Sequence, residues 1–150
     1  MTATPLPGTA GLDLERAESF PHWTHEVLRF SDTDAFGHIN NGAYASCFEN
    51  ARIKLTRRIG AEAAEGEVDW VLARLCIDYR AQLFYPGEVE VGTRLTRVGG
   101  ASLALAQGLF AAGTCRATAS AVLVLIDVPS GASAPIPETM RARLAPLVEV

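Results

Sequence analysis

The residues best suited to chemistry lie in the segment RFSDTDAFGHINNG, just before a long helical pattern. Two carboxylates, Asp32 and Asp34, are followed by His38 and by the adjacent pair Asn40 and Asn41. A positioned carboxylate acts as a general base or as a nucleophile, and an imidazole exchanges protons near neutral pH. The segment therefore holds the groups that hydrolysis of a reactive carbonyl compound requires.

The stretch that follows has the period of an amphipathic helix, and we expect it to end near Gly60. Its apolar positions recur at steps of three and four: Tyr44, Phe48, Ala51, Leu55 and Ile59. Asn40 and Asn41 are favourable N-cap residues, and Gly42 allows a ligand to approach the backbone. The first turn of a helix has free N–H groups and partial positive charge, so a developing oxyanion can be held there.

Each polar residue of the segment also has a structural interpretation. Asp32 is expected to shape the loop as a turn acceptor. His38 either ties the loop together or supports the carboxylate as a proton carrier, and the Asn side chains either cap the helix or orient water and substrate. Glu49, two turns into the helix, is a reserve acid whose alternative is a solvated or salt-bridged side chain.

The whole string resembles a known family. S-D-T-D-A-F-G-H-I-N-N-G-x-Y followed by F-E-N-A-R is similar to the opening of the hotdog-fold thioesterases, in the branch of 4-hydroxybenzoyl-coenzyme A (CoA) thioesterase and related acyl-CoA thioesterases. The resemblance implies that Asp34 is the catalytic carboxylate and that backbone amides near Asn41 and Gly42 polarise the thioester carbonyl. Some members of the family place the acid on the helix, which is why Glu49 is kept in reserve.

Composition limits the class of protein. The chain has 150 residues, is 49% hydrophobic and carries a net charge of -4, which suits one globular domain and argues against nucleic acid as the main partner. It has 3 widely spaced Cys and no uninterrupted apolar run of membrane-spanning length. The segment after Met1 lacks the layout of a signal peptide. We expect a cytoplasmic protein with reduced thiols and no membrane partner.

The remaining elements follow from periodicity and turn chemistry. Residues 1–21 are expected to form a flexible leader before a single domain at 22–150. A first strand is predicted at Trp23–Ser31, and the later strands and terminal helix at Val71–Tyr79, Val89–Leu95, Leu103–Leu109, Arg116–Asp127 and Glu138–Leu144. In the second strand, Val71, Ala73 and Leu75 are predicted to share one face.

Together these elements predict an α+β fold, in which an antiparallel sheet of about five strands wraps around one long central helix. That arrangement agrees with the hotdog fold implied by the resemblance. Such a sheet has exposed edges, which pairing across a dimer would protect. The resemblance likewise implies a homodimer or a tetramer of dimers, with the active site at the subunit interface.

The sequence also indicates candidate contacts to the substrate. The phosphates of CoA need cations, and Arg57, Arg58 and Arg80 are the candidates. An acyl group could lie against Phe36, Tyr44 and Phe48, for which core packing is the competing interpretation. There is no metal-ligand spacing such as H-E-x-x-H or C-x-x-C, no G-x-S-x-G and no phosphate-binding glycine loop, so no metal and no cofactor are expected.

The function predicted from the sequence is hydrolysis of acyl-CoA thioesters. Asp34 either deprotonates water or attacks the carbonyl directly, and acyl-chain length and aryl preference are left open. One alternative is a thioesterase that acts on acyl-carrier protein or releases a polyketide. Another is a hotdog hydratase or dehydratase, which typically sets Asp and His five apart in a loop with Pro, whereas Asp34 and His38 are four apart. The last is a non-enzymatic acyl-binding protein.

Overall fold

The computed structural model describes residues 6–58 and 67–148. One long helix, α1 (Asn41–Arg58), follows the first strand, β1 (His22–Val27). The other strands and the terminal helix come next: β2 (Val68–Tyr79), β3 (Glu88–Val98), β4 (Ser102–Ala111), β5 (Thr114–Asp127) and α2 (Glu138–Leu144). The predicted helix end near Gly60, and Ile59, lie outside the described residues.

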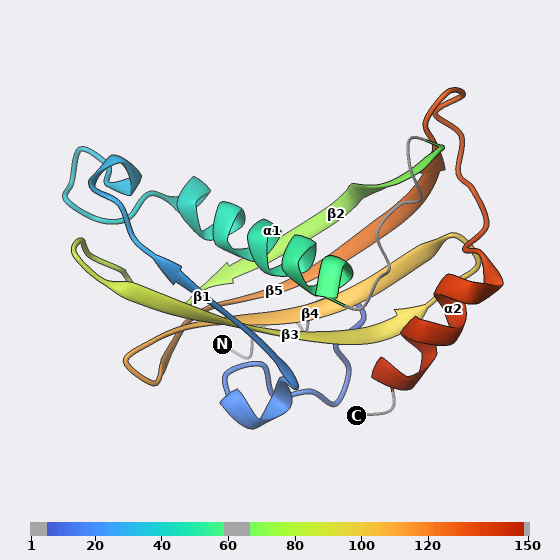
Figure 1. Cartoon of the computed structure of the whole chain (residues 1–150). Helices are drawn as coiled ribbons and strands as arrows, with labels where there is room; N and C mark the ends of the chain where they lie inside the picture. The colour runs from blue at the N-terminus through green and yellow to red at the C-terminus, as the bar shows by residue number, and fades with distance from the viewer. Residues whose placement is uncertain (1–5, 59–66, 149–150) are drawn as a thin grey trace.

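The five strands form one antiparallel sheet in the order β1-β3-β4-β5-β2. The sheet curves around α1, which lies in its concave face (Figure 1). Gly99–Gly100 connects β3 to β4, and Ala112–Gly113, with φ of 49° and 74°, connects β4 to β5. The predicted α+β arrangement of about five strands around one helix is confirmed.

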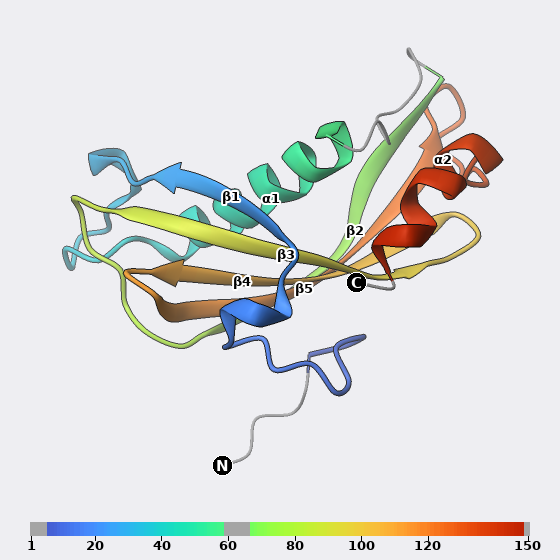
Figure 2. The same ribbon diagram turned by 60° about the horizontal axis from the view of Figure 1, so that its bottom comes forward.

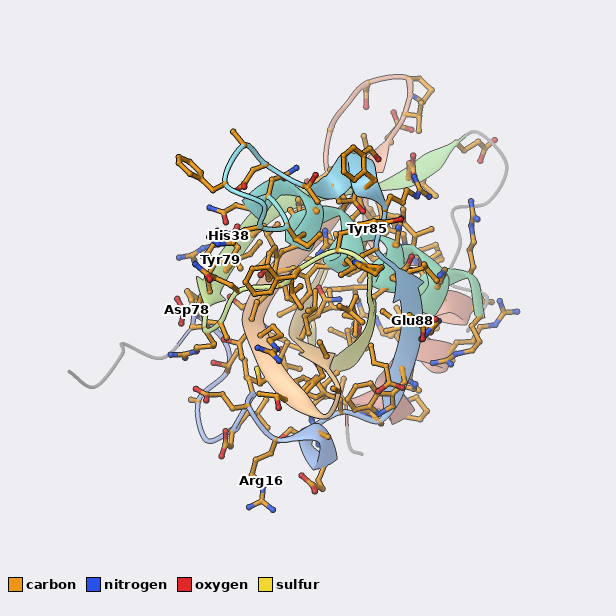
Figure 3. All side chains as sticks on the ribbon, turned by 90° about the vertical axis from the view of Figure 1, so that its left-hand side faces the viewer. Arg16, His38, Asp78, Tyr79, Tyr85 and Glu88 are labelled. Carbon is orange, nitrogen blue, oxygen red and sulfur yellow. The ribbon has the colours of Figure 1, made fainter. Side chains whose placement is uncertain are left out.

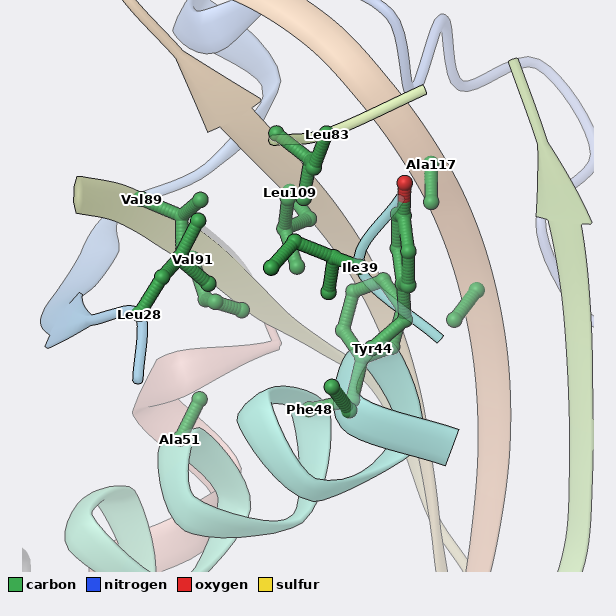
Figure 4. Packing of buried hydrophobic residues seen from close by; sticks show 12 residues of the cluster. Leu28, Ile39, Tyr44, Phe48, Ala51, Leu83, Val89, Val91, Leu109 and Ala117 are labelled. Carbon is green, nitrogen blue, oxygen red and sulfur yellow. The ribbon is translucent and has the colours of Figure 1, made fainter. Parts of the chain in front are cut away.

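The core lies between α1 and the middle of the sheet. Tyr44, Phe48 and Ala51 point from the helix toward Val91 and Leu109 of the strands, and all five are buried (Figure 4). α1 packs mainly on β3, with further contacts to β1 and β4. The helix is therefore held over one half of the sheet, and β2 forms the opposite edge.

The first strand is shorter than predicted, because β1 ends at Val27 rather than Ser31. A 3-10 turn at Phe30–Asp32 follows it, in which Oδ2 of Asp32 accepts a hydrogen bond of 2.8 Å from the Arg29 amide. The side chain of Asp32 thus turns the chain away from the sheet. This is the loop-shaping role expected for Asp32.

The predicted alternation in β2 fails at one point. The register with β5 shifts between Leu72 and Arg74, so Ala73 is a bulge. Leu72 pairs with Leu123 and Leu75 with Ala121, and these two β5 residues share the buried face of their strand. The bulge therefore places Leu72, rather than Val71 and Ala73, on the face of Leu75.

The described part of the expected leader packs against the sheet. Residues 6–21 cross the face opposite α1 (Figure 2), where Leu14 and Phe20 are buried against Phe110. A Cβ at Gly92 would lie 2.6 Å from the Phe20 side chain, and one at Gly108 would lie 2.7 Å from it. The absence of side chains at these glycines makes room for Phe20, so this segment differs from the flexible leader predicted.

Candidate active site

A short hydrogen-bonded loop holds Asp34 before the central helix. Oδ1 of Asp34 accepts bonds from the amides of Phe36 (2.8 Å) and His38 (3.1 Å), while the Asp34 amide donates to the His38 carbonyl at 2.7 Å. Gly37 has a φ of 80°, which lets the chain turn tightly between them. One carboxylate oxygen therefore holds the loop, and Oδ2, which has no partner among the described residues, can meet water or substrate.

The beginning of α1 is capped by Asn40. Its Oδ1 accepts the Ala43 amide at 3.0 Å, and its own amide donates to the Asp32 carbonyl at 2.8 Å. A Cβ at Gly42 would lie 3.0 Å from this Oδ1, so glycine leaves the capping side chain in place. No acceptor within the described ranges takes the amides of Asn41 and Gly42, which thus remain available to a ligand oxygen.

Two tyrosines fasten this end of the helix to the end of β2. The hydroxyl of Tyr44 donates to the Ala81 carbonyl, and that of Tyr79 donates to the Asn41 carbonyl, both at 3.2 Å. The two rings meet edge to face with centroids 5.2 Å apart. Burial raises the pKa of Tyr44, which therefore stays protonated and keeps its donor. The helix terminus and the strand end are held as one unit.

These groups open into one cavity of about 260 Å³. Asp34, His38, Asn41, Tyr44 and Arg80 line it, and all five belong to the set predicted from the sequence. Tyr79, which also lines the cavity, projects beside His38 at the same end of the molecule (Figure 3). The carboxylate, the helix terminus and one cation thus lie together.

His38 is tied to Asp34 through backbone hydrogen bonds. Its ring lies edge to face against Phe84, with centroids 5.3 Å apart. The backbone of His38 therefore ties the loop together, whereas the loop-tying role expected of its ring nitrogens stays a prediction. Its position in the wall of the cavity also leaves the ring within the space that a substrate would enter.

The cation in the cavity is already paired. Nε of Arg80 lies 3.3 Å from Glu15 and Nη2 lies 3.5 Å from Asp78. Arg58 lies at the other end of α1, where its Nη2 donates to Nδ1 of His22 at 2.8 Å in a separate cavity of about 290 Å³. Arg57 and Arg58 are roughly 25 Å from the first turn along the helix. The three predicted CoA cations therefore do not form one patch.

Other predicted residues lie elsewhere. The Phe36 side chain is 85% exposed at the loop tip, and that of Phe48 is completely buried in the core. Asn40 and Asp32 act through the loop and cap described above. Glu49 is exposed and lines a different cavity, of about 110 Å³, together with Arg52. Of the proposed acyl contacts, only Tyr44 faces the cavity that holds Asp34.

The sequence analysis did not name Tyr79, which lines the cavity of Asp34, or Arg52, which lines a separate cavity, among its candidate site residues. Tyr79 is the last residue of β2 and belongs to no sequence motif. It alternates with Leu75 and Ile77, which pack against the core. Arg52 follows Phe48 by four residues, and that spacing put a charged side chain on the apolar side of the helix. The helical period was therefore a usable signal for Arg52. For Tyr79 the chain offered none.

Within the described ranges, no group of three or more His, Cys, Asp or Glu side chains is placed to hold a metal ion. Nor does any helix of those ranges combine the length and the apolar character of a membrane span. The thiols of Cys47, Cys76 and Cys115 are free and partly buried. Burial raises the pKa of Cys47 to about 11, so its thiol is protonated at neutral pH.

Comparison with known proteins gives consistent matches. The model of the thioesterase-like superfamily matches residues 28–144. A thioesterase from Thermus thermophilus, solved in complex with coenzyme A and Zn, is 36% identical, with a TM-score of 0.75 and coverage of 87% of this chain and 97% of that one.

Two further proteins are similar. The PA5185 protein of Pseudomonas aeruginosa strain PAO1 has a TM-score of 0.79 and 29% identity, covering 87% of this chain and 93% of its own. YsmA of Bacillus subtilis (strain 168), an uncharacterized protein, is 31% identical over 87 residues. That match spans 58% of this chain and 59% of YsmA, which is less than two thirds of either.

Proposed function

Because the chain belongs to the thioesterase-like superfamily, we propose that it hydrolyses acyl-CoA thioesters with Asp34 as the essential carboxylate. One observation carries this proposal: Asp34 and the first turn of α1 line the same cavity. A thioester carbonyl is already electrophilic, so its hydrolysis needs a base or nucleophile and a site that holds negative charge on oxygen. The loop supplies the first, and the helix terminus supplies the second.

In the general-base route, Asp34 takes a proton from water, and the hydroxide adds to the thioester carbon. The carbonyl oxygen gains negative charge beside the amides of Asn41 and Gly42 and the positive end of the helix. When the tetrahedral intermediate collapses, the C–S bond breaks and the proton passes from Asp34 to the departing sulfur. The products are the free acid and the thiol.

In the covalent route, Oδ2 of Asp34 attacks the carbonyl, and the C–S bond breaks to give a mixed anhydride and a thiolate. Water then adds to the anhydride and releases the acid. A single turnover in H₂¹⁸O tests the covalent route. If water attacks the aspartyl carbonyl of the anhydride, ¹⁸O enters Asp34, which identifies the covalent route. If Asp34 stays unlabelled, trapping of the anhydride with hydroxylamine distinguishes attack on the acyl carbonyl from the general-base route.

CoA as the thiol is supported by similarity to the Thermus thermophilus thioesterase that was solved with coenzyme A. Arg80 lines the cavity proposed for the thioester, although it shares its charge with Glu15 and Asp78. A carrier-protein thioester would present the same reacting bond to the same loop. Comparing kcat/KM for the CoA ester and the carrier-protein ester of the same acyl group decides which of the two is the substrate.

We also propose that the active form is a homodimer paired through β2. This strand is an edge of the sheet, and Val71, Leu72 and Tyr79 are exposed large apolar side chains on it. An unpaired apolar edge is a template for a second strand. The cavity of Asp34 is walled partly by the end of β2, so a second copy along this edge would approach the proposed site.

The test is release of free thiol from short, long and aromatic acyl-CoA esters. We expect the wild type to turn over at least one class, and Asp34→Asn to lower kcat by about a hundredfold or more while the unfolding temperature changes little. If Glu49→Gln shows that loss and Asp34→Asn does not, the catalytic carboxylate is on the helix. Hydration of enoyl-CoA without thiol release would instead identify a hydratase.

A further inference from the structure

A second polar feature lies along the same helix, on the side that faces β2. Arg52 is only 3% exposed, although it carries a charge. Its Nη1 donates to Oε1 of Gln107 at 2.9 Å, and Nε2 of Gln107 donates in turn to the Phe48 carbonyl and to Oγ1 of Thr93, each at 3.1 Å. Both ends of the Gln107 amide are therefore occupied, and the guanidinium is held in a fixed place.

Among the residues that the structure describes, Gln107 is the hydrogen-bond partner of the Arg52 guanidinium. A guanidinium has five N–H donors, and Gln107 provides a single neutral acceptor. Among the described carboxylates none forms an ion pair with Arg52. Burial lowers the pKa of Arg52, and the charge of Glu49, three residues earlier, acts in the opposite direction. A buried cation of this kind is costly unless an acceptor, above all an anion, completes its shell.

Space for such an anion lies beside it. Arg52 lines a cavity of about 110 Å³ between α1 and the other edge of the sheet, together with Ile53, Thr56, Trp70 and Leu72. Apart from Arg52 and the exposed Glu49, the walls are mostly apolar. The cavity can thus receive the end of an apolar chain that carries an oxygen-bearing group.

This cavity and the one that holds Asp34 lie along the same two elements, α1 and β2 (Figure 1). Asn41 and Tyr44 of the helix line the first cavity, and Arg52 lines the second. The rise of the helix puts Arg52 about 16.5 Å from Asn41 along the axis, and the Arg52 side chain leans back toward the N-terminus. The two cavities share no lining residue, so an extended acyl chain that leaves a thioester at the first turn would have to follow α1 to reach Arg52.

The geometry points to a substrate whose acyl group carries a carboxylate at its far end, which Arg52 binds in the groove between α1 and β2. This inference rests on the proposed thioesterase function and names its substrate class: the CoA half-thioesters of dicarboxylic acids. Guanidinium and carboxylate match in charge and in the geometry of two parallel hydrogen bonds. A methyl-ended chain of equal length would offer no acceptor to the guanidinium, which Glu49 influences by its charge without forming an ion pair.

The first experiment compares matched substrates. Each pair consists of an acyl-CoA and an ω-carboxyacyl-CoA ester of equal carbon number, and the pairs run from short to long. We assay them with the wild type, Arg52→Met and Arg52→Lys. The control is Arg97→Met, which removes an exposed Arg from β3. At the best length we expect kcat/KM to favour the carboxylate by about tenfold or more, which is the worth of one charge-assisted contact. Arg52→Met should abolish this ratio, Arg52→Lys should keep part of it, and Arg97→Met should retain it.

The second experiment does not depend on hydrolysis. Free dicarboxylic acids should raise the unfolding temperature of the wild-type protein more than monocarboxylic acids of the same length, because only they offer an anion to Arg52. This measurement also covers the case in which Arg52→Met fails to fold. If the diacids stabilise the protein but no thioester is cleaved, the proposed enzymatic function fails and the anion site stands.

Two results would overturn the inference. One is equal kcat/KM for the members of every pair, together with equal thermal shifts for mono- and dicarboxylic acids. The other is a carboxylate preference that survives in folded Arg52→Met. In either case Arg52 is a structural side chain that completes its hydrogen bonds with water.

Discussion

At the residue scale, the two aspartates of the D-x-D pair have different partners. The carboxylate of Asp32 accepts a hydrogen bond from the Arg29 amide. That of Asp34 accepts hydrogen bonds from the amides of Phe36 and His38. Both aspartates therefore shape the loop, which was the structural interpretation of the pair. Only Asp34 also lines the cavity at the helix terminus, so a structural role and a catalytic one are compatible in a single side chain.

The imidazole of His22 makes stability depend on pH. Its Nδ1 accepts a hydrogen bond from Arg58, and its Nε2 is buried without a partner among the described residues. Burial, and then the charge of Arg58, lower the pKa of His22 below its ordinary 6.5. In the unfolded chain His22 binds a proton as the pH falls through about 6.5, whereas the folded protein resists it, so folding stability is lost toward acid.

We therefore expect His22→Asn to lose less stability than the wild type between about pH 7 and pH 5. Asn can still accept the hydrogen bond from Arg58 but has no titrating group. Urea unfolding at both pH values gives the two changes in free energy. Equal changes in the two proteins would mean that His22 titrates alike in the folded and unfolded states.

At the element scale, the segment before β1 acts as a cover for the back of the sheet. Phe20 is 4% exposed and contacts Trp23 and Phe110 with ring centroids 6.1 Å away in each case. Gly92 and Gly108 leave the space that its ring occupies. This arrangement makes the segment part of the folded domain, because it covers the buried side chains on that face of the sheet.

Phe20→Ala should lower the free energy of unfolding by about 3 kcal/mol, because it removes a buried ring and leaves a cavity. Phe36→Ala is the matched control, since its exposed side chain should cost less than about 0.5 kcal/mol. Chemical denaturation of the two variants measures both values. A loss at Phe20 no larger than at Phe36 would show that the segment does not contribute to the stability of the sheet.

The element scale also explains how the site is positioned. The loop of Asp34, the first turn of α1 and the end of β2 are held by short-range hydrogen bonds and by the two tyrosines. α1 itself packs mainly on β3. The helix is thus fixed by the half of the sheet that carries the core, while its other side lines the two cavities that we assign to the substrate.

At the scale of the whole molecule, β2 is the edge through which we propose that two copies pair. Val71→Lys places a charge on this edge at an exposed position, so it should leave the fold of the single chain intact. In light scattering we expect the wild type to have the mass of a dimer or of a larger assembly of dimers. The variant should dissociate into single chains at a higher protein concentration than the wild type. A monomeric wild type would contradict the proposed pairing.

The cytoplasmic location, the homo-oligomeric state and the absence of a cofactor stay predictions. Their physical motivation is the composition of the chain, the exposed strand edge and the sufficiency of one carboxylate and one helix terminus for thioester hydrolysis. Membership of the thioesterase-like superfamily is established by the match over residues 28–144.

The sequence alone determined the local features of this protein. The helical period after Asn41, the alternation of the strands and the turn residues at Gly99–Gly100 and Ala112–Gly113 each depend on neighbours along the chain, and the predicted fold class follows from their order. The D-x-D loop beside a helix terminus is equally local. This is why the sequence by itself predicts that Asp34, His38 and Asn41 lie together.

Only the tertiary structure decided which distant residues meet. Tyr79 and Arg80 join the cavity because the sheet order sets the end of β2 against the start of α1. Arg52 meets Gln107, 55 residues away, because β4 lies beneath the helix. A single bulge at Ala73 reversed the faces predicted for part of β2. Strand order, register and bulges are settled by packing between remote segments, and no pattern confined to one segment contains that information.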